Sequence, residues 1–257
     1  NKTNRRSSNM WPRRLHGLDR IQSRISARQH LETSLIYSLK HMIKIVNIVL
    51  YIGFLGLLGS PCKAGEIVDD ALQAINLGDI KGIQDGLRRG LDANYADQDG
   101  NTLLMLSARS GHAEGVALLL NAGAKVYPSN RHGDTALLLA SFGGYENIVN
   151  MLLAKGGSLD GNARGWTPLH YAAFAGHARL VEKFLDHRAN INAKTQIDLT
   201  PLMVAAMNGH LDVVKMLLKY NADTTPRDAN GRSARDHALA RGNSTIADAL
   251  VRAAPKQ

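Results

Sequence analysis

Apolar residues after residue 65 fall into short segments at helical spacing, and these segments come in pairs. Residues 198–223 show the pattern best: Thr200 and Pro201 are typical of a helix start, and Gly209 is typical of a helix end. A second apolar segment with the same spacing follows and runs to Asn221, which can also end a helix. Two helices this short cannot bury their apolar faces alone. The pattern therefore predicts that each pair packs against another copy of itself.

The copies are present and in phase. The capping hydroxyl recurs at intervals of 33, 32, 33 and 33 residues, at Thr102, Thr135, Thr167, Thr200 and Ser233. A glycine recurs between the two helices of each pair, at Gly78, Gly111, Gly144, Gly176, Gly209 and Gly242. A fixed period of this length is the sequence signature of a solenoid, in which each unit contacts only its neighbours. The sequence therefore predicts an all-α solenoid of stacked helix pairs.

One unit carries a motif that points to a family. It reads Thr167-Pro-Leu-His-Tyr-Ala-Ala173, followed by Gly176-His177. With this motif and the period of 33, residues 66–253 resemble the ankyrin-repeat family. The resemblance implies stacked helix pairs with short β-hairpin loops, in about six units of which the first and last are caps. The expected units are 66–96, 97–128, 129–161, 162–193, 194–226 and 227–253, within an ankyrin-repeat domain of residues 65–257.

Two places depart from the repeat pattern. One residue is missing between Gly156 and Gly165, which predicts a shortened hairpin loop. Asp198 stands where the turn of the family has glycine. Aspartate adopts the left-handed conformation less freely than glycine, so we expect mild strain or a changed turn there.

Charge is distributed unevenly along the chain, whose formal net charge is +9. Residues 1–64 carry 11 of the 31 basic residues and 2 of the 22 acidic ones, so residues 65–257 carry 20 of each. A nucleic-acid-binding surface needs a clustered excess of positive charge. The repeats have no such overall excess, and we expect no nucleic-acid partner.

Within residues 1–64, the basic residues lie mostly in 1–41, which carry nine Lys or Arg and two acidic residues. We interpret this segment as a basic extension that is disordered or lies upstream of the true start of the protein. The alternative is a basic arm that binds an anionic partner or surface.

Residues 42–64 have the layout of a secretory signal peptide. A positive start, Met42-Ile-Lys44, precedes an apolar run over 45–58, and small residues precede a cut after Ala64. The run is shorter than the roughly 20 residues that span a bilayer. A retained membrane anchor stays open as an alternative, and a lipoprotein is disfavoured because Pro61 precedes the lone Cys62. We therefore expect a periplasmic or secreted bacterial protein.

Histidines are the main candidates for chemistry, and seven of the ten lie after residue 65. His112, His177 and His210 each follow an inter-helix glycine, and His170 lies in the Thr-Pro-Leu-His turn. In the family that the repeats resemble, such histidines hydrogen-bond neighbouring loops. They lack the spacing of a zinc site, and the chain carries no nucleophile elbow or phosphate-binding loop. We expect no enzymatic activity, metal, cofactor or small-molecule substrate.

A partner-binding surface is the remaining hypothesis. By resemblance, partners contact the residue before each capping Thr and the two residues before each inter-helix glycine. These positions hold apolar residues in the middle units and arginines at the flanks, and the candidate set is Arg109, Phe142, Trp166, Phe174, Leu199, Met207, Arg232 and Arg241. Aromatic residues, Met and Arg are enriched at binding hot spots. Alternatively, Trp166 and Phe174 pack against the next hairpin and Met207 fills a gap between units.

The sequence thus predicts an exported, monomeric ankyrin-repeat scaffold that binds an unidentified protein. The first alternative is an adaptor tethered to the membrane by residues 45–58. A less favoured alternative is an enzyme whose active site joins residues of different units.

Overall fold

A computed structural model describes residues 63–253 of the chain. The predicted basic extension, and the predicted signal peptide up to residue 62, lie outside the described residues. Within residues 63–253, no helix is both long enough and apolar enough to cross a membrane.

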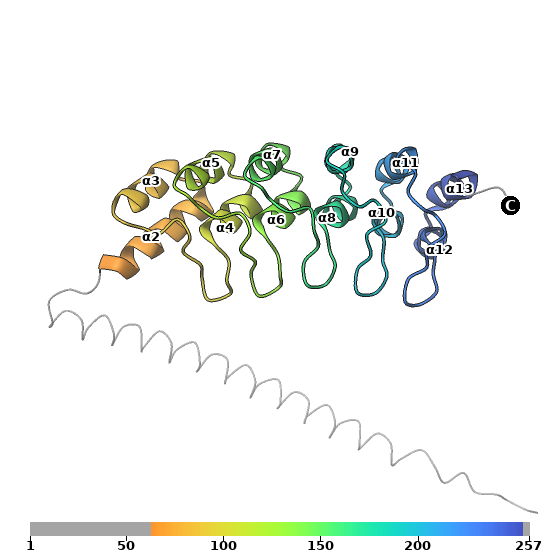
Figure 1. The fold of residues 1–257 in the computed structure, drawn as a ribbon, viewed down its shortest axis with the longest axis horizontal. Coiled ribbons are helices and arrows are strands. Elements are labelled where there is room, and N and C mark those ends of the chain that lie inside the picture. Colours follow the sequence, from red (N-terminus) through yellow and green to blue (C-terminus); the bar gives the residue numbers. More distant parts are fainter. Residues whose placement is uncertain (1–62, 254–257) are drawn as a thin grey trace, which may run out of the picture. The chain divides into compact units, whose positions relative to one another are not determined.

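The described residues form six helix pairs (Figure 1). The first helices of the pairs lie side by side in one row, and the second helices form a second row (Figure 1). We call the two rows the inner and the outer helices. In chain order the pairs are α2 (Lys63–Leu77) with α3 (Ile80–Arg88), α4 (Leu103–Ser110) with α5 (Ala113–Asn121), α6 (Ala136–Gly143) with α7 (Glu146–Ala154), α8 (Pro168–Ala175) with α9 (Ala178–Asp186), α10 (Pro201–Asn208) with α11 (Leu211–Lys219), and α12 (Ala234–Ala240) with α13 (Ser244–Ala253).

The predicted capping residues begin the inner helices. The hydroxyl of Thr200 accepts a hydrogen bond from the backbone N–H of Met203, which satisfies one of the free donors at the start of α10. The same contact recurs at the other four predicted caps, Thr102, Thr135, Thr167 and Ser233. All six predicted inter-helix glycines have a positive φ, between 69° and 83°. The repeat pattern therefore marks both ends of the inner helices correctly.

The core runs continuously through the stack, between the two rows of helices. Small residues line the inner helices: Ala205 and Ala206 of α10 are fully buried, and the neighbouring helix lies close to them. The outer helices add larger apolar side chains, of which Phe184 is the largest that is fully buried. Each unit buries its apolar face against the next one, as expected for a solenoid.

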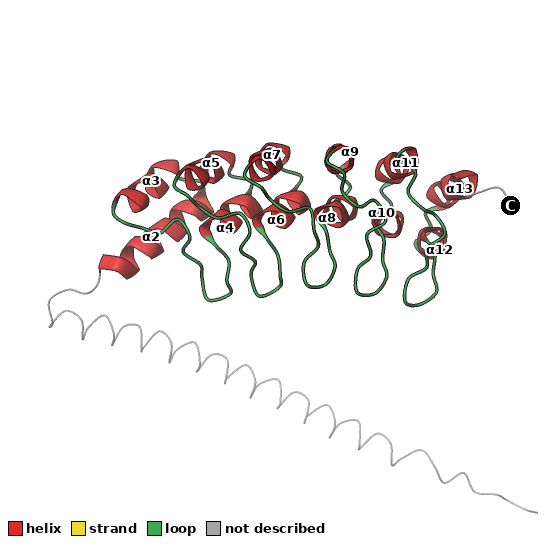
Figure 2. Cartoon of the chain, in the orientation of Figure 1, coloured by secondary structure: helices red, strands yellow, loops and turns green. Residues whose placement is uncertain are grey.

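The loops that join consecutive pairs are turns rather than β-hairpins (Figure 2). Within residues 63–253 there is no strand, and the one isolated bridge pairs Ala96 with Thr102. Each turn closes with a backbone bond such as Thr195 N–H to Leu199 O, at 3.0 Å. The flanking segments are too short to extend this pairing into a ladder. The expected fold is confirmed, and its β-hairpins are reduced to single hydrogen-bonded turns.

The two departures from the repeat pattern are accommodated locally. The turn from Asn162 to Trp166 has the usual length, so the missing residue falls in the segment that enters it. There, a side chain on Gly161 would come within 2.9 Å of the backbone of Gly165. Asp198 has a φ of 58° and keeps the ordinary turn bond, from its N–H to Thr195 O. The turn is therefore unchanged, and the residue adopts the left-handed conformation that the sequence suggested.

Candidate functional site

Four aromatic side chains meet on the inner face, the surface formed by the inner helices and the turns before them. Phe142 lies near the end of α6, Tyr171 and Phe174 lie on α8, and Trp166 lies in the turn before α8. We call these four residues the aromatic cluster. Phe142 and Phe174 each stand two residues before an inter-helix glycine, so the repeat brings them side by side. Tyr171 and Phe174 are three residues apart, which places them on the same face of α8.

The four rings form a closed circuit. Phe142 lies 6.3 Å from Tyr171 and 6.0 Å from Phe174, measured between ring centroids. Trp166 lies 5.4 Å from Tyr171 and 5.9 Å from Phe174. These separations, and the edge-on angles of 90° and 69° at two of the contacts, are typical of favourable aromatic pairs. The packing fixes the orientation of the rings before any partner binds.

The aromatic cluster remains open to solvent on one side. Phe142 is 50% exposed and Phe174 is 36% exposed, while Trp166 and Tyr171 are half-buried. A cavity of about 440 Å³ lies beside the rings, and its wall is completed by His132, Asp134, Asn162 and Arg164. This volume lies within the range of roughly 300–1,000 Å³ that is typical of ligand-binding pockets.

A polar contact between two repeats supports the cavity wall. The hydroxyl of Tyr171 donates a hydrogen bond to Asp134 Oδ1 at 2.7 Å, and Asn162 Nδ2 donates to the same oxygen at 3.2 Å. Burial, together with the hydrogen bond to Asp134, raises the pKa of Tyr171 far above its ordinary value. Tyr171 therefore stays protonated and holds the carboxylate of Asp134 beside the rings.

The structure brings together three of the predicted contact residues and separates the others. Phe142, Trp166 and Phe174 lie in the aromatic cluster. Leu199 was predicted to lie on the surface, but its side chain is only 6% exposed. It packs into the core, where an apolar side chain is removed from water. Met207 is half-buried on α10 and is absent from the cavity wall. The predicted line of apolar residues therefore loses Leu199, and Met207 lies outside the cavity wall.

The predicted arginines lie apart from the aromatic cluster. Arg109, Arg232 and Arg241 are exposed, and none of them lines the cavity. Arg232 forms an ion pair of 3.4 Å with Asp228 in the last repeat.

The predicted set lacks five residues that line this cavity, which are His132, Asp134, Asn162, Arg164 and Tyr171. Tyr171 had a detectable signal, since it precedes Phe174 by three positions on a helix whose Phe174 was already a candidate. Asn162 and Arg164 lie in the turn before α8. The course of that turn places them at the cavity, and the repeat spacing does not predict that course.

The repeat histidines connect neighbouring units, but only His170 bonds to a loop carbonyl, that of Leu199, as the resemblance implied; the other three bond to carbonyls near the ends of inner helices. Each ring that follows an inter-helix glycine bonds to a carbonyl of the preceding repeat: His112 to Ile75, His177 to Phe142 and His210 to Phe174, at 2.8–3.0 Å. His170 is fully buried, and burial lowers its pKa to about 4. Within residues 63–253, no group of three or more metal-ligating side chains is found.

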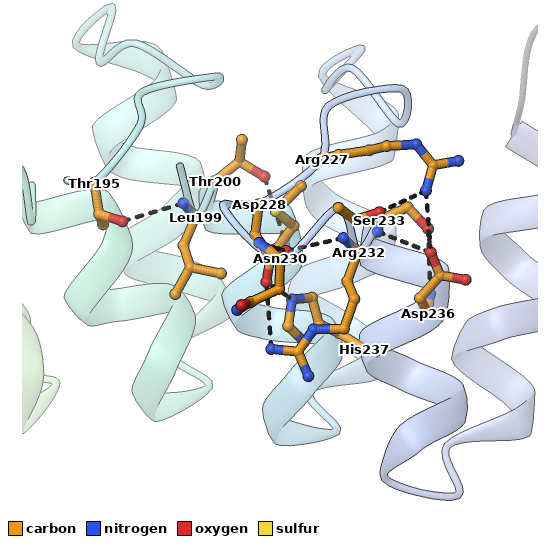
Figure 3. A network of polar contacts seen from close by, with 12 residues as sticks. Thr195, Leu199, Thr200, Arg227, Asp228, Asn230, Arg232, Ser233, Asp236 and His237 are labelled. Carbon is orange, nitrogen blue, oxygen red and sulfur yellow. Dashed lines mark hydrogen bonds and ion pairs between the residues drawn. The ribbon is translucent and has the colours of Figure 1, made fainter. Parts of the chain in front are cut away.

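A second polar cluster lies in the last repeat (Figure 3). Asp228 Oδ2 lies 2.9 Å from His237 Nε2, and both side chains are buried. Asp228 Oδ1 accepts the backbone N–H groups of Asn230 and Arg232. Burial alone would raise the pKa of Asp228, but these hydrogen bonds outweigh it and lower the pKa. Asp228 thus fixes the last turn to helix α12, which is a structural role.

Comparison with known proteins agrees with this architecture. A family model for three copies of the ankyrin repeat matches residues 71–163, 133–195 and 192–257, and the chain belongs to the ankyrin-repeat family. A plant relative, the serine/threonine-protein kinase 12 of Arabidopsis thaliana, is 40% identical over 74 residues, which cover 28% of this chain and 16% of the kinase.

Two animal relatives match similar stretches. A transient receptor potential cation channel subfamily A member 1 homolog of Caenorhabditis elegans is 30% identical over 100 residues, 39% of this chain and 8% of the channel. The mouse protein fem-1 homolog A-like is 29% identical over 97 residues, 38% of this chain and 15% of that protein. The chain therefore spans less than a fifth of the length of each of these three relatives.

Proposed function

We propose that the chain is a non-enzymatic scaffold that binds a partner protein on the inner face, with the aromatic cluster as the central contact. The observation that carries this proposal is the exposure of Phe142 and Phe174, which lie in neighbouring repeats and are held in place by Trp166 and Tyr171. Contiguous exposed apolar patches on monomeric proteins are often functional. Aromatic side chains at the centre of an interface supply much of its binding energy.

The titratable groups of the stack support a binding role over a catalytic one. His170 and Asp228 have shifted pKa values, but their polar atoms are used in hydrogen bonds that hold repeats and turns together. The similarity to a kinase covers only 16% of that protein. We therefore assign no reaction to the repeats.

Cross-linking at defined positions tests this function. A photoreactive phenylalanine analogue placed at Phe174 in the full-length chain should cross-link one protein reproducibly in cells. The matched control places the analogue at Lys215, an exposed position on the outer helix α11. A cross-link at Phe174 alone supports the inner face as the binding surface. Equal cross-links at both positions, or none at Phe174, would contradict the proposal.

Export is the second part of the proposed function. The basic start at Lys44, the apolar run over 45–58 and the small residues before Gly65 support a cleaved signal peptide and a periplasmic scaffold. The alternative is an adaptor that keeps residues 45–58 as a membrane anchor. The mass of the protein isolated from its native cells distinguishes them, because cleavage gives a chain that starts at Gly65.

A further inference from the structure

We propose that the cavity beside the aromatic cluster binds an arginine side chain of the partner protein. This inference rests on the proposed function, since it assigns the chemistry of one contact on the same inner face. The first support is the closed circuit of four rings, in which each centroid lies 5.4–6.3 Å from two neighbours. Aromatic faces attract cations through the ring quadrupole, and arginine is more often the cation in such contacts than lysine.

The second support is a carboxylate beside the rings. Asp134 Oδ1 accepts hydrogen bonds from Tyr171 and Asn162, whereas Oδ2 has no hydrogen-bond partner within residues 63–253. Tyr171 donates its hydroxyl hydrogen to Asp134, so the phenol oxygen can accept another bond. A guanidinium group carries N–H donors in one plane and can donate to a carboxylate while its face lies on a ring. A lysine ammonium is more strongly hydrated and lacks this planar geometry.

The third support is access. Phe142 and Phe174 are partly exposed at the rim, so a side chain from outside can reach the cavity. The cavity, at about 440 Å³, has room for a guanidinium group and its apolar stem. The stem would contact the rings of the rim, which suits the amphipathic character of arginine.

One charge on the same cavity opposes an incoming cation. Arg164 lines the wall, its side chain is exposed, and it makes no ion pair with any residue of the described part of the chain. Solvent and salt screen the charge of an exposed group, so the repulsion from Arg164 is weakened but not abolished. Removing the charge of Asp134 and removing that of Arg164 should therefore change the affinity for arginine in opposite directions.

The test is a titration of the full-length chain with short peptides, followed by the NMR signals of ¹⁵N-labelled indoles. The chain has two tryptophans, and the indole signal that is absent from the variant Trp166→Phe is the one that reports on the cavity. Four glycine peptides are compared, which carry a single arginine, citrulline, lysine or leucine. Citrulline matches arginine in shape but has no charge. The variants Asp134→Asn and Arg164→Gln are titrated alongside, after thermal unfolding has shown that both are folded.

The expected result is that the arginine peptide shifts the Trp166 signal and binds about five- to thirtyfold more tightly than the citrulline peptide. Asp134→Asn should reduce this preference, and Arg164→Gln should increase it. The proposal is overturned if citrulline, lysine or leucine binds as tightly as arginine, or if no peptide shifts the Trp166 signal. Tight binding of the leucine peptide would leave the inner face as a binding surface and remove only its arginine specificity. Failure of the proposed function itself would appear instead as the loss of cross-links at Phe174.

Discussion

The Nε2 atom of His170 lies 3.0 Å from the carbonyl oxygen of Leu199, which belongs to the next repeat. A carbonyl can only accept, so Nε2 carries the hydrogen, and Nδ1 accepts the backbone N–H of Thr167 at 3.3 Å. The neutral imidazole therefore satisfies both contacts within the stack. A protonated ring would lose the bond from the N–H of Thr167 and would leave a buried charge.

This contact predicts a pH dependence of stability. Burial lowers the pKa of His170 from 6.5 to about 4, so between these values the unfolded chain binds a proton that the folded chain does not. The stabilisation is fully present above pH 6.5 and is lost as the pH falls toward 4, with a total of about 3 kcal/mol. Denaturant unfolding at several pH values gives the free energy of unfolding as a function of pH. Between pH 6.5 and 4 this free energy should fall less steeply with pH in His170→Gln than in the natural chain. If the free energy of unfolding depends on pH equally in both proteins, His170 is not buried as a neutral ring.

The inter-helix glycine Gly144, and Gly123, which follows the outer helix α5, predict a difference between two substitutions at positions with similar backbone strain. Gly144 and Gly123 have φ values of 75° and 88°. A side chain on Gly144 would come within 2.5 Å of the His177 ring, which bonds to Phe142 O, whereas Gly123 has open space. Gly144→Ala should therefore destabilise the protein by about 1–2 kcal/mol more than Gly123→Ala. Chemical denaturation measures both, and equal losses would show that the His177 contact adds nothing.

Much of the fold could be predicted because the repeated residues have roles that depend only on the backbone around them. A cap such as Thr167 and a left-handed position such as Gly176 are decided by the backbone next to them. The surface depends instead on the direction of each side chain. Trp166 and Leu199 hold equivalent positions before a capping Thr, yet one joins the exposed aromatic cluster and the other is buried. No spacing rule separates them, since the outcome depends on what each side chain meets in the adjacent repeat.

Arg188 predicts a stabilising substitution. It has a φ of 63° at a helix end where three other repeats carry glycine and one carries asparagine. Its side chain is exposed, and within residues 63–253 it makes no ion pair. Left-handed backbone costs about 1–2 kcal/mol for residues with a Cβ atom. Arg188→Gly should raise the free energy of unfolding by about 1 kcal/mol.

The matched control for this substitution is Arg179→Gly, which removes an exposed arginine from within helix α9. It should lower the free energy of unfolding by up to about 1 kcal/mol, because glycine weakens a helix and Arg179 lies in its first turn. A change of the same sign in Arg188→Gly and Arg179→Gly would contradict the assignment of strain at Arg188.

The buried pair of the last repeat predicts a loss of stability. Removing Asp228 leaves His237 and two backbone N–H groups without their acceptor, so Asp228→Ala should cost about 3–5 kcal/mol. Asp228→Asn keeps one acceptor oxygen and should cost less. The exposed Asp223, which also accepts a backbone N–H of its own turn, provides the control. If Asp223→Ala is as damaging as Asp228→Ala, burial is not the cause.

The most direct measurement compares the affinity of the cross-linked partner for two variants of the full-length chain. Phe142→Ala with Phe174→Ala removes both exposed rings of the aromatic cluster, and Tyr127→Ala removes an aromatic side chain that is 71% exposed outside it. If the inner face is the binding surface, the double variant should bind at least about thirtyfold more weakly, while Tyr127→Ala should bind normally. Unfolding curves confirm that both variants remain folded. A double variant that is folded and binds with full affinity would contradict the proposal that the aromatic cluster is the central contact.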